Sequence, residues 1–281
     1  MLDSGPRPRL RPAFQLIALD LDGTLLDSHA RVSTGNAAAI AACQAAGVRV
    51  TLATGKLLIS ARHICDQLGL REPQITANGA ALMGRDPERI LDVSPLPAAD
   101  YQAAMAALAE YELPAAAYTP HAIYTAALDP RLHAVVVIHE PQPIVLPDVA
   151  HRAAVDGAPF VKVLTMLDQH DPASTATEAD LRARFAGGLT VVRTSPVFLE
   201  FLAPGVSKGR ALRRLAGLLD LDLAAVLAIG DSYNDLPLLA TAGFSVAMGN
   251  APPEVQAAAQ AVTADNDHDG VAAAIYRYVL P

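Results

Sequence analysis

The chain has 281 residues, enough for one large domain or two ordinary ones, and its 52% apolar composition can fill a sizeable core. The formal net charge of −8 argues against a nucleic-acid or anionic-membrane partner, although it leaves room for a local basic pocket. No apolar run reaches the roughly eighteen residues of a membrane span. The two cysteines, Cys43 and Cys65, lie in helical patterns without a neighbouring thiol, which is typical of reduced core residues. We therefore expect a soluble, cytoplasmic protein.

Strands and helices alternate in the first part of the chain. A segment rich in Pro and Arg, residues 1–13, is expected to be a loose tail. The predicted elements then follow in the order strand, helix, strand, helix, strand: 15–20, 33–46, 48–53, 57–68 and 74–77. This alternation is typical of a parallel sheet with helices on both faces.

The same alternation returns late in the chain. The predicted strands are 197–202, 225–229 and 244–247, and the predicted helices are 207–219, one after Asn234, 252–260 and 270–279. The fold class is therefore α/β, with a Rossmann-like parallel sheet built from two separate stretches of chain.

The stretch between them, residues 85–191, has a different texture. Prolines cluster in it, one long helix is predicted over Ala98–Tyr111, and short strand-like runs occur as AAYT, AIYTA, AVVVI, FVKVLTM and LTVVR. This mixture favours an inserted α+β domain. The predicted organisation is a tail (1–13), a core (14–84 with 192–281) and an insert (85–191).

Each predicted strand of the alternating part ends in polar residues. These residues are Asp20, Asp22 and Thr24; Thr54 and Lys56; Lys208; and Asp231, Asn234 and Asp235. Ligands of open parallel sheets bind outside the carboxyl ends of the strands, so the four groups are expected to converge on one site. A simple hairpin at Asp22-Gly23 is the alternative for the first group, but it does not account for the other three.

The types of residue in this set indicate a phosphate and a metal ion. Lys56 and Lys208 stand at predicted helix N-termini, where the helix dipole disfavours cations unless an anion joins them. Several carboxylates crowded together would repel one another and take up protons. A hard divalent cation resolves that conflict, and Mg²⁺ is the usual partner of phosphate with one or two carboxylates.

The stretches DLDGTLL, TLATGK, GVSKGRAL and AIGDSYNDLPLLATAGFSVAMGNAPPEV together resemble the four motifs of the haloacid dehalogenase (HAD) superfamily of phosphatases. Their order, the ANGA after the third strand and the late VAMGNA are similar to the Cof-type subfamily. The position of the insert, between ANGA and GVSKG, resembles the second cap class (C2B, class IIB), an α/β lid of enzymes that act on small phosphorylated metabolites such as sugar phosphates.

The resemblance implies roles for the site residues. Asp20 would be the nucleophile, which forms an aspartyl-phosphate, and Asp22 the general acid and base. The implied phosphate- and substrate-binding residues are Thr54, Gly55, Lys208, Asn234, Asn78 and Gly79. Mg²⁺ would be held by Asp20, Asp231 and the backbone carbonyl of Asp22, with Asp235 supporting the site from behind. Lys56 departs from the family, which usually has arginine there. Lysine keeps the positive charge but lacks the planar donor pair with which arginine makes a bidentate phosphate contact.

Residues outside these motifs have weaker signals. His29 is expected to be an exposed loop histidine. Tyr118, His121 and Tyr124 of the insert could face the substrate, although such aromatic residues more often pack inside a domain.

Three functions follow from these observations. The first is a Mg²⁺-dependent phosphatase of small phosphate esters, most simply sugar phosphates, and the second is a phosphomutase on the same machinery. The third is a non-enzymatic phospho-receiver or binding module. A receiver domain also combines paired acids with Thr and Lys, but it is only about half as long as this chain. Neither the substrate nor the oligomeric state can be read from the sequence.

Overall fold

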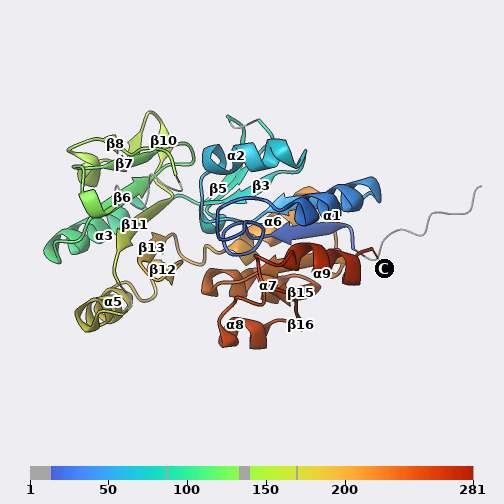
Figure 1. Ribbon diagram of the computed structural model, residues 1–281. Helices are drawn as coiled ribbons and strands as arrows, with labels where there is room; N and C mark the ends of the chain where they lie inside the picture. Colours follow the sequence, from blue (N-terminus) through green and yellow to red (C-terminus); the bar gives the residue numbers. More distant parts are fainter. Residues whose placement is uncertain (1–13, 87, 133–139, 169, 281) are drawn as a thin grey trace, which may run out of the picture.

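The computed structural model describes residues 14–86, 88–132, 140–168 and 170–280 (Figure 1). The expected tail, residues 1–13, and the strand-like run AVVVI therefore fall outside the described residues. Within the described ranges, no helix is both long and apolar enough to cross a membrane.

Five strands form one parallel sheet in the order β16-β15-β14-β1-β2. Their bounds are Leu16–Leu19 (β1), Arg49–Leu52 (β2), Val226–Gly230 (β14), Phe244–Ala247 (β15) and Ala261–Val262 (β16). Beside β2, β3 (Gln74–Thr76) continues the sheet through a single parallel bridge between Ala53 and Ile75. The predicted parallel α/β sheet is confirmed.

Helices cover both faces of this sheet. Ile17 and Leu19 of β1 pack into a cluster with residues of α1, α2 and α9, whereas Leu16 and Ala18 pack on the other face with α6, α7 and α8. A strand buried on both faces has no polar alternation, which explains its unbroken apolar sequence. The helices span Thr34–Ala45 (α1), Leu58–Gln67 (α2), Lys208–Leu218 (α6), Leu236–Thr241 (α7), Pro253–Ala258 (α8) and Gly270–Tyr278 (α9).

A second sheet lies beside the first (Figure 1) and has the order β12-β13-β11-β6-β7-β8. Its pairs are antiparallel except β7 with β8. The strands span Ala115–Tyr118 (β6), Ile123–Thr125 (β7), Ile144–Val145 (β8), Lys162–Met166 (β11), Thr190–Arg193 (β12) and Phe198–Leu202 (β13). Helices α3 (Ala98–Glu110) and α5 (Pro172–Arg184) share one apolar cluster with this sheet.

Short elements complete the fold. They are β4 (Ala81–Met83), β5 (Ile90–Val93), β9 (Ala154–Val155), β10 (Ala158–Pro159) and the 3₁₀ turns η1 (Ala77–Gly79), η2 (Val149–His151), η3 (Leu223–Ala225) and η4 (Tyr233–Asp235). Strands β3, β4 and β5 form a small antiparallel sheet.

One predicted strand was assigned to the wrong sheet. The run at 197–202 was expected in the parallel sheet, but β13 pairs antiparallel with both β11 and β12. An apolar run indicates that a strand is buried, but it does not indicate which strand lies beside it. The partners of β13 could therefore not be predicted from its own residues. The insert was predicted as residues 85–191, and we propose instead that it runs from Val93 to Leu202. We call this insert the cap unit and the remaining described residues the core unit.

Both cysteines are buried and unpaired, as expected. Cys43 of α1 and Cys65 of α2 pack in the same apolar cluster of the core unit. Burial raises the pKa of each thiol to about 11, so both remain protonated at neutral pH.

Candidate active site

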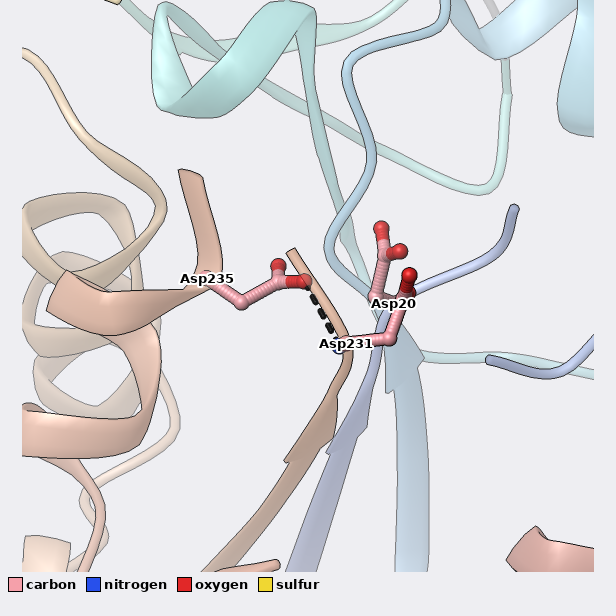
Figure 2. A group of neighbouring side chains, drawn as sticks. All are labelled: Asp20, Asp231 and Asp235. Atoms are coloured by element: carbon pink, nitrogen blue, oxygen red, sulfur yellow. Dashed lines mark hydrogen bonds between the residues drawn. The ribbon is translucent and has the colours of Figure 1, made fainter. Parts of the chain in front are cut away.

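Three carboxylates meet at the carboxyl edge of the parallel sheet. Asp20 follows β1 and Asp231 follows the adjacent β14, and Figure 2 shows their side chains next to each other above the strand ends. Asp235 approaches from the turn that follows Asp231. One oxygen of each carboxylate lies within 4.8 Å of the others. The expected convergence of these acidic residues is therefore confirmed.

Lys208 lies among these acids. Its Nζ donates to Oδ1 of Asp20 and to Oδ1 of Asp235, at 2.6 Å each, and the side chain is only 1% exposed. Burial alone would lower the pKa of Lys208, but Asp20 and Asp235 outweigh it and raise that pKa. The lysine reaches the site from the first turn of α6, capped by Ser207, and not from the end of a core strand. Its unfavourable place at a helix N-terminus is thus compensated by two carboxylates.

Negative charge still exceeds positive charge in the cluster. Burial and the neighbouring Asp235 raise the pKa of Asp20 well above its ordinary value, although Lys208 opposes them. Burial and Asp235 also raise the pKa of Asp231 to about 6, against a 2.7 Å hydrogen bond from the Thr24 hydroxyl. Carboxylates that resist ionisation together are the donor set that a hard divalent cation fits.

Asp235 is fully engaged by the protein. Its Oδ1 accepts from Lys208, and its Oδ2 accepts the backbone N–H groups of Asp231 and Ser232 at 3.0 Å each. It therefore holds Lys208 and the Asp231 backbone in place, in agreement with the supporting position expected from the sequence.

The loop after β1 passes very close to Asp231. Gly23 has a φ of +77°, and a Cβ atom there would lie 2.5 Å from Oδ2 of Asp231. Only glycine fits this approach without strain. Asp22, one residue earlier, is half exposed and pairs with the Lys56 ammonium. The two neighbouring acids thus have different environments, because Asp20 is buried and Asp22 is accessible.

The ANGA turn supports the site from the core unit. Gly79 has a φ of +91°, and a Cβ atom there would lie 2.3 Å from the Ser207 carbonyl oxygen, so the glycine lets η1 pack against the start of α6. Asn78 is 2% exposed and hydrogen-bonds to Asn234 and Glu200. Neither Asn78 nor Gly79 is among the residues that line the cavity between the core unit and the cap unit. Any contact of these two residues with a substrate is therefore indirect in this structure.

A cavity of about 600 Å³ lies between the core unit and the cap unit. The core unit lines it with Asp20, Asp22, Gly23, Thr54, Gly55, Lys56, Asp231, Ser232 and Asn234. The cap unit lines it with Tyr118, Glu140, Lys162, Leu164, Thr194, Ser195, Pro196, Val197, Phe198 and Glu200. The volume suits a small phosphorylated molecule.

Of the aromatic candidates, Tyr118 lines this cavity, whereas Tyr124 packs edge-on against Phe160 at 6.3 Å between ring centroids. His121 is not among the lining residues.

The sequence interpretation missed three charged residues of the cap unit. Lys162 donates to the Gly55 carbonyl oxygen at 2.9 Å and to Glu200 at 3.1 Å. Glu140 accepts the N–H of Leu57 at 3.1 Å, at the start of α2. For Lys162 and Glu200 the available signal was a charge inside an apolar run, in FVKVLTM and FLEFL, since a buried charge requires a partner.

Comparison with known proteins gives the family. A sequence model of the haloacid dehalogenase-like hydrolases matches residues 17–275, so the chain belongs to that family. Phosphatase YwpJ of Bacillus subtilis is 32% identical over 92% of this chain and 98% of its own length. From the same organism, 5-amino-6-(5-phospho-D-ribitylamino)uracil phosphatase YcsE is 30% identical over 95% of this chain and 96% of its own.

A haloacid dehalogenase-like hydrolase from B. subtilis has the same fold, with a TM-score of 0.84 at 28% identity over 95% of this chain and all of that one. The predicted HAD superfamily, its Cof-type phosphatase subfamily and the core-plus-cap architecture are thereby confirmed. The chain is a HAD-type phosphatase, and the non-enzymatic receiver hypothesis is excluded.

Proposed function

We propose that the chain hydrolyses small phosphorylated metabolites, sugar phosphates among them, through an aspartyl-phosphate on Asp20 and with Mg²⁺ bound. The observation that carries the proposal is the buried Asp20, held by Lys208 beside Asp231 at the floor of the cavity. The substrate after which YcsE is named, a phosphorylated ribityl compound, belongs to the same class of small phosphate esters. We further propose a cytoplasmic location and no nucleic-acid partner, in keeping with the net charge of −8.

In this mechanism the Asp20 carboxylate attacks phosphorus while the bond from phosphorus to the leaving oxygen breaks. Asp22, the accessible acid, gives its proton to that oxygen. Asp22 then takes a proton from the water that attacks the phosphoenzyme. This attack breaks the bond from phosphorus to Asp20, so that inorganic phosphate and free Asp20 are released. Lys208, Thr54 and the Gly55 backbone would hold the phosphoryl oxygens.

Mg²⁺ would be held by Asp20, Asp231 and the backbone carbonyl of Asp22, where it would neutralise charge on the phosphoryl group. Lys56 supplies a further positive charge next to Asp22, although without the planar donor pair of an arginine.

The test is a screen of phosphorylated metabolites with Mg²⁺ in which released phosphate is measured. Activity should vanish on chelation and return with Mg²⁺, whereas Ca²⁺ should support little turnover because its looser coordination misplaces the nucleophile. Full activity in excess chelator would contradict the assignment of Asp231 as a metal ligand. Transfer of the phosphoryl group to a second sugar in place of water would instead identify a phosphomutase.

A further inference from the structure

A line of buried polar side chains runs from the cap unit to the cavity. It begins at Lys162 of β11, continues through Glu200 of β13 and Asn78 of η1, and ends at Asn234 of η4. The first three residues are each at most 3% exposed. Two of the four come from each unit, so the line exists only when the two units are packed together.

The hydrogen bonds along this line form an unbroken series. Glu200 Oε1 accepts from Lys162 Nζ and from the Thr194 hydroxyl, both at 3.1 Å. Glu200 Oε2 accepts from the Asn78 amide nitrogen at 2.6 Å. The Asn78 oxygen in turn accepts from the Asn234 amide nitrogen at 2.9 Å.

The charge of Glu200 sets the direction of the whole line. A carboxylate paired with an ammonium can only accept, so Asn78 must turn its NH₂ group toward Glu200 and its oxygen toward Asn234. Asn234 must then use its own NH₂ group toward Asn78. The orientation of both amides follows from this donor–acceptor order and does not depend on telling oxygen from nitrogen by shape.

The consequence appears at the cavity. Asn234 lines it, and Oδ1 of Asn234 is buried with no hydrogen-bond donor in the described part of the protein. A buried acceptor without a donor costs free energy, which a ligand that donates there would recover. Anionic phosphoryl oxygens cannot donate, whereas water can.

We propose that Glu200 is a positioning residue that fixes Asn234 as a hydrogen-bond acceptor for the water that hydrolyses the phosphoenzyme. The inference rests on the proposed function. The family resemblance implies that Asn234 binds the phosphate or substrate, and the inference assigns it to the water that attacks the phosphate. One O–H of that water gives its proton to Asp22 and the other donates to Asn234, while the water oxygen attacks phosphorus and the bond to Asp20 breaks. Packing of the cap unit thereby prepares the second half of the reaction.

Two substitutions test the direction of the line. In Glu200→Gln, the new amide oxygen faces Lys162 and Thr194, so its NH₂ group faces Asn78 and both asparagines turn over. Asn234 then presents a donor to the cavity. Adding Asn78→Asp restores the original direction, because the carboxylate it introduces accepts both from the new amide at position 200 and from Asn234. The total charge of the line is the same in this double variant as in the wild type.

The experiment measures kcat and KM for p-nitrophenyl phosphate, whose leaving group has no hydroxyl besides the oxygen that leaves phosphorus, together with inhibition by inorganic phosphate. For Glu200→Gln we expect kcat to fall about tenfold to a hundredfold, the worth of one hydrogen bond to a reacting group, and KM to fall with it. The ratio kcat/KM reports only the steps up to and including phosphoryl transfer to Asp20. It should therefore change by less than about threefold. Phosphate should inhibit more strongly, because a donor now faces it. The double variant should recover kcat to within about threefold of the wild type, by the cycle logic for residues in contact.

Two controls keep the test decisive. Glu110→Gln makes the same change at an exposed cap glutamate paired with Arg184, and all three quantities should stay at wild-type values. Asn234→Leu removes the acceptor without touching the cap unit, so it should lower kcat without strengthening phosphate inhibition even if Glu200→Gln fails to fold.

The inference is overturned if the wild type is active and the double variant recovers no better than either single variant. Equal losses of kcat and kcat/KM in Glu200→Gln would also overturn it. A wild type that releases no phosphate from any ester would instead contradict the proposed function, and with it this inference.

Discussion

The core unit and the cap unit face the same cavity with different chemistry. From the core come the carboxylates of Asp20, Asp22 and Asp231, and the buried Lys208 donates a hydrogen bond to the first of them. From the cap come apolar groups, such as Leu164 and Phe198, together with hydroxyl groups and charged groups that include a buried ion pair. The groups that we propose to be reactive thus belong to the core unit, and the cap unit supplies further groups that would contact or orient a ligand.

This division has a physical reason. Ends of neighbouring parallel strands lie about 5 Å apart, so residues that follow them are brought together by the sheet itself. An antiparallel sheet instead presents one broad face of alternating side chains, which suits a wall or lid. If the division is correct, substitutions in the core unit should lower the rate for every substrate. Substitutions in the cap unit should change which substrate is preferred, which step limits the rate, or how firmly the two units pack together.

The largest effect is expected from Asp20→Asn. Loss of the nucleophile removes the covalent route, so kcat/KM should fall by at least about 10⁴-fold for all substrates alike. Steady-state assays with one sugar phosphate and p-nitrophenyl phosphate measure this, with circular dichroism as the folding control. Residual activity that differed strongly between the two substrates would break the proposed division.

Asp22→Ala should show a graded loss. A sugar alkoxide is a poor leaving group that needs a proton, so kcat/KM should fall by about 10² to 10⁴ with a sugar phosphate. The p-nitrophenolate leaving group hardly needs a proton, so its loss should be much smaller. Equal losses on both substrates would mean that Asp22 positions the loop or the metal and is not the general acid.

Glu140 tests the contact between the two units. Burial raises its pKa to about 7 from an ordinary 4.5, although Lys162 opposes the shift. Because the folded state holds this proton more tightly than the unfolded state, protonated Glu140 contributes to the free energy of unfolding. The contribution is fully present below pH 4.5 and is lost as pH rises through about 7. Between pH 5 and 8 the wild type should therefore lose on the order of 2 kcal/mol relative to Glu140→Gln, which does not ionise.

Chemical denaturation of both proteins across that pH range measures the difference. A constant gap between the two would contradict the raised pKa. The opposite slope would mean that the ionised carboxylate, bound to the Leu57 N–H, is the favoured form.

The smallest effect is expected from Phe198→Ala in the cap wall. Loss of apolar contact should lower kcat/KM by about tenfold for a bulky phosphate ester. Acetyl phosphate, too small to reach the wall, should be hydrolysed within about twofold of the wild-type rate. Steady-state kinetics on both esters checks this, and equal losses would place Phe198 with the reactive machinery.

Much of the core unit could be predicted from the sequence. The unbroken apolar run before Asp20 and the acids after it are local features, and each is buried or placed by its own strand. The convergence of strand ends in a parallel sheet was enough to predict that Asp20 and Asp231 meet, and the structure shows that β1 and β14 are adjacent. The family motifs added roles that local physics alone left open.

The tertiary structure decided how the cap unit meets this site. β13 was assigned to the wrong sheet because its apolar run does not specify a partner. The bonds from Asn78 to Glu200 and from Asn234 to Asn78 join residues 122 and 156 positions apart in the chain. No local sequence period specifies such long-range contacts, and the bond from Asn78 to Glu200 also requires the core unit and the cap unit to pack together. The acidic residues of the site could therefore be predicted from the sequence, whereas the line of hydrogen bonds that ends at Asn234 could not.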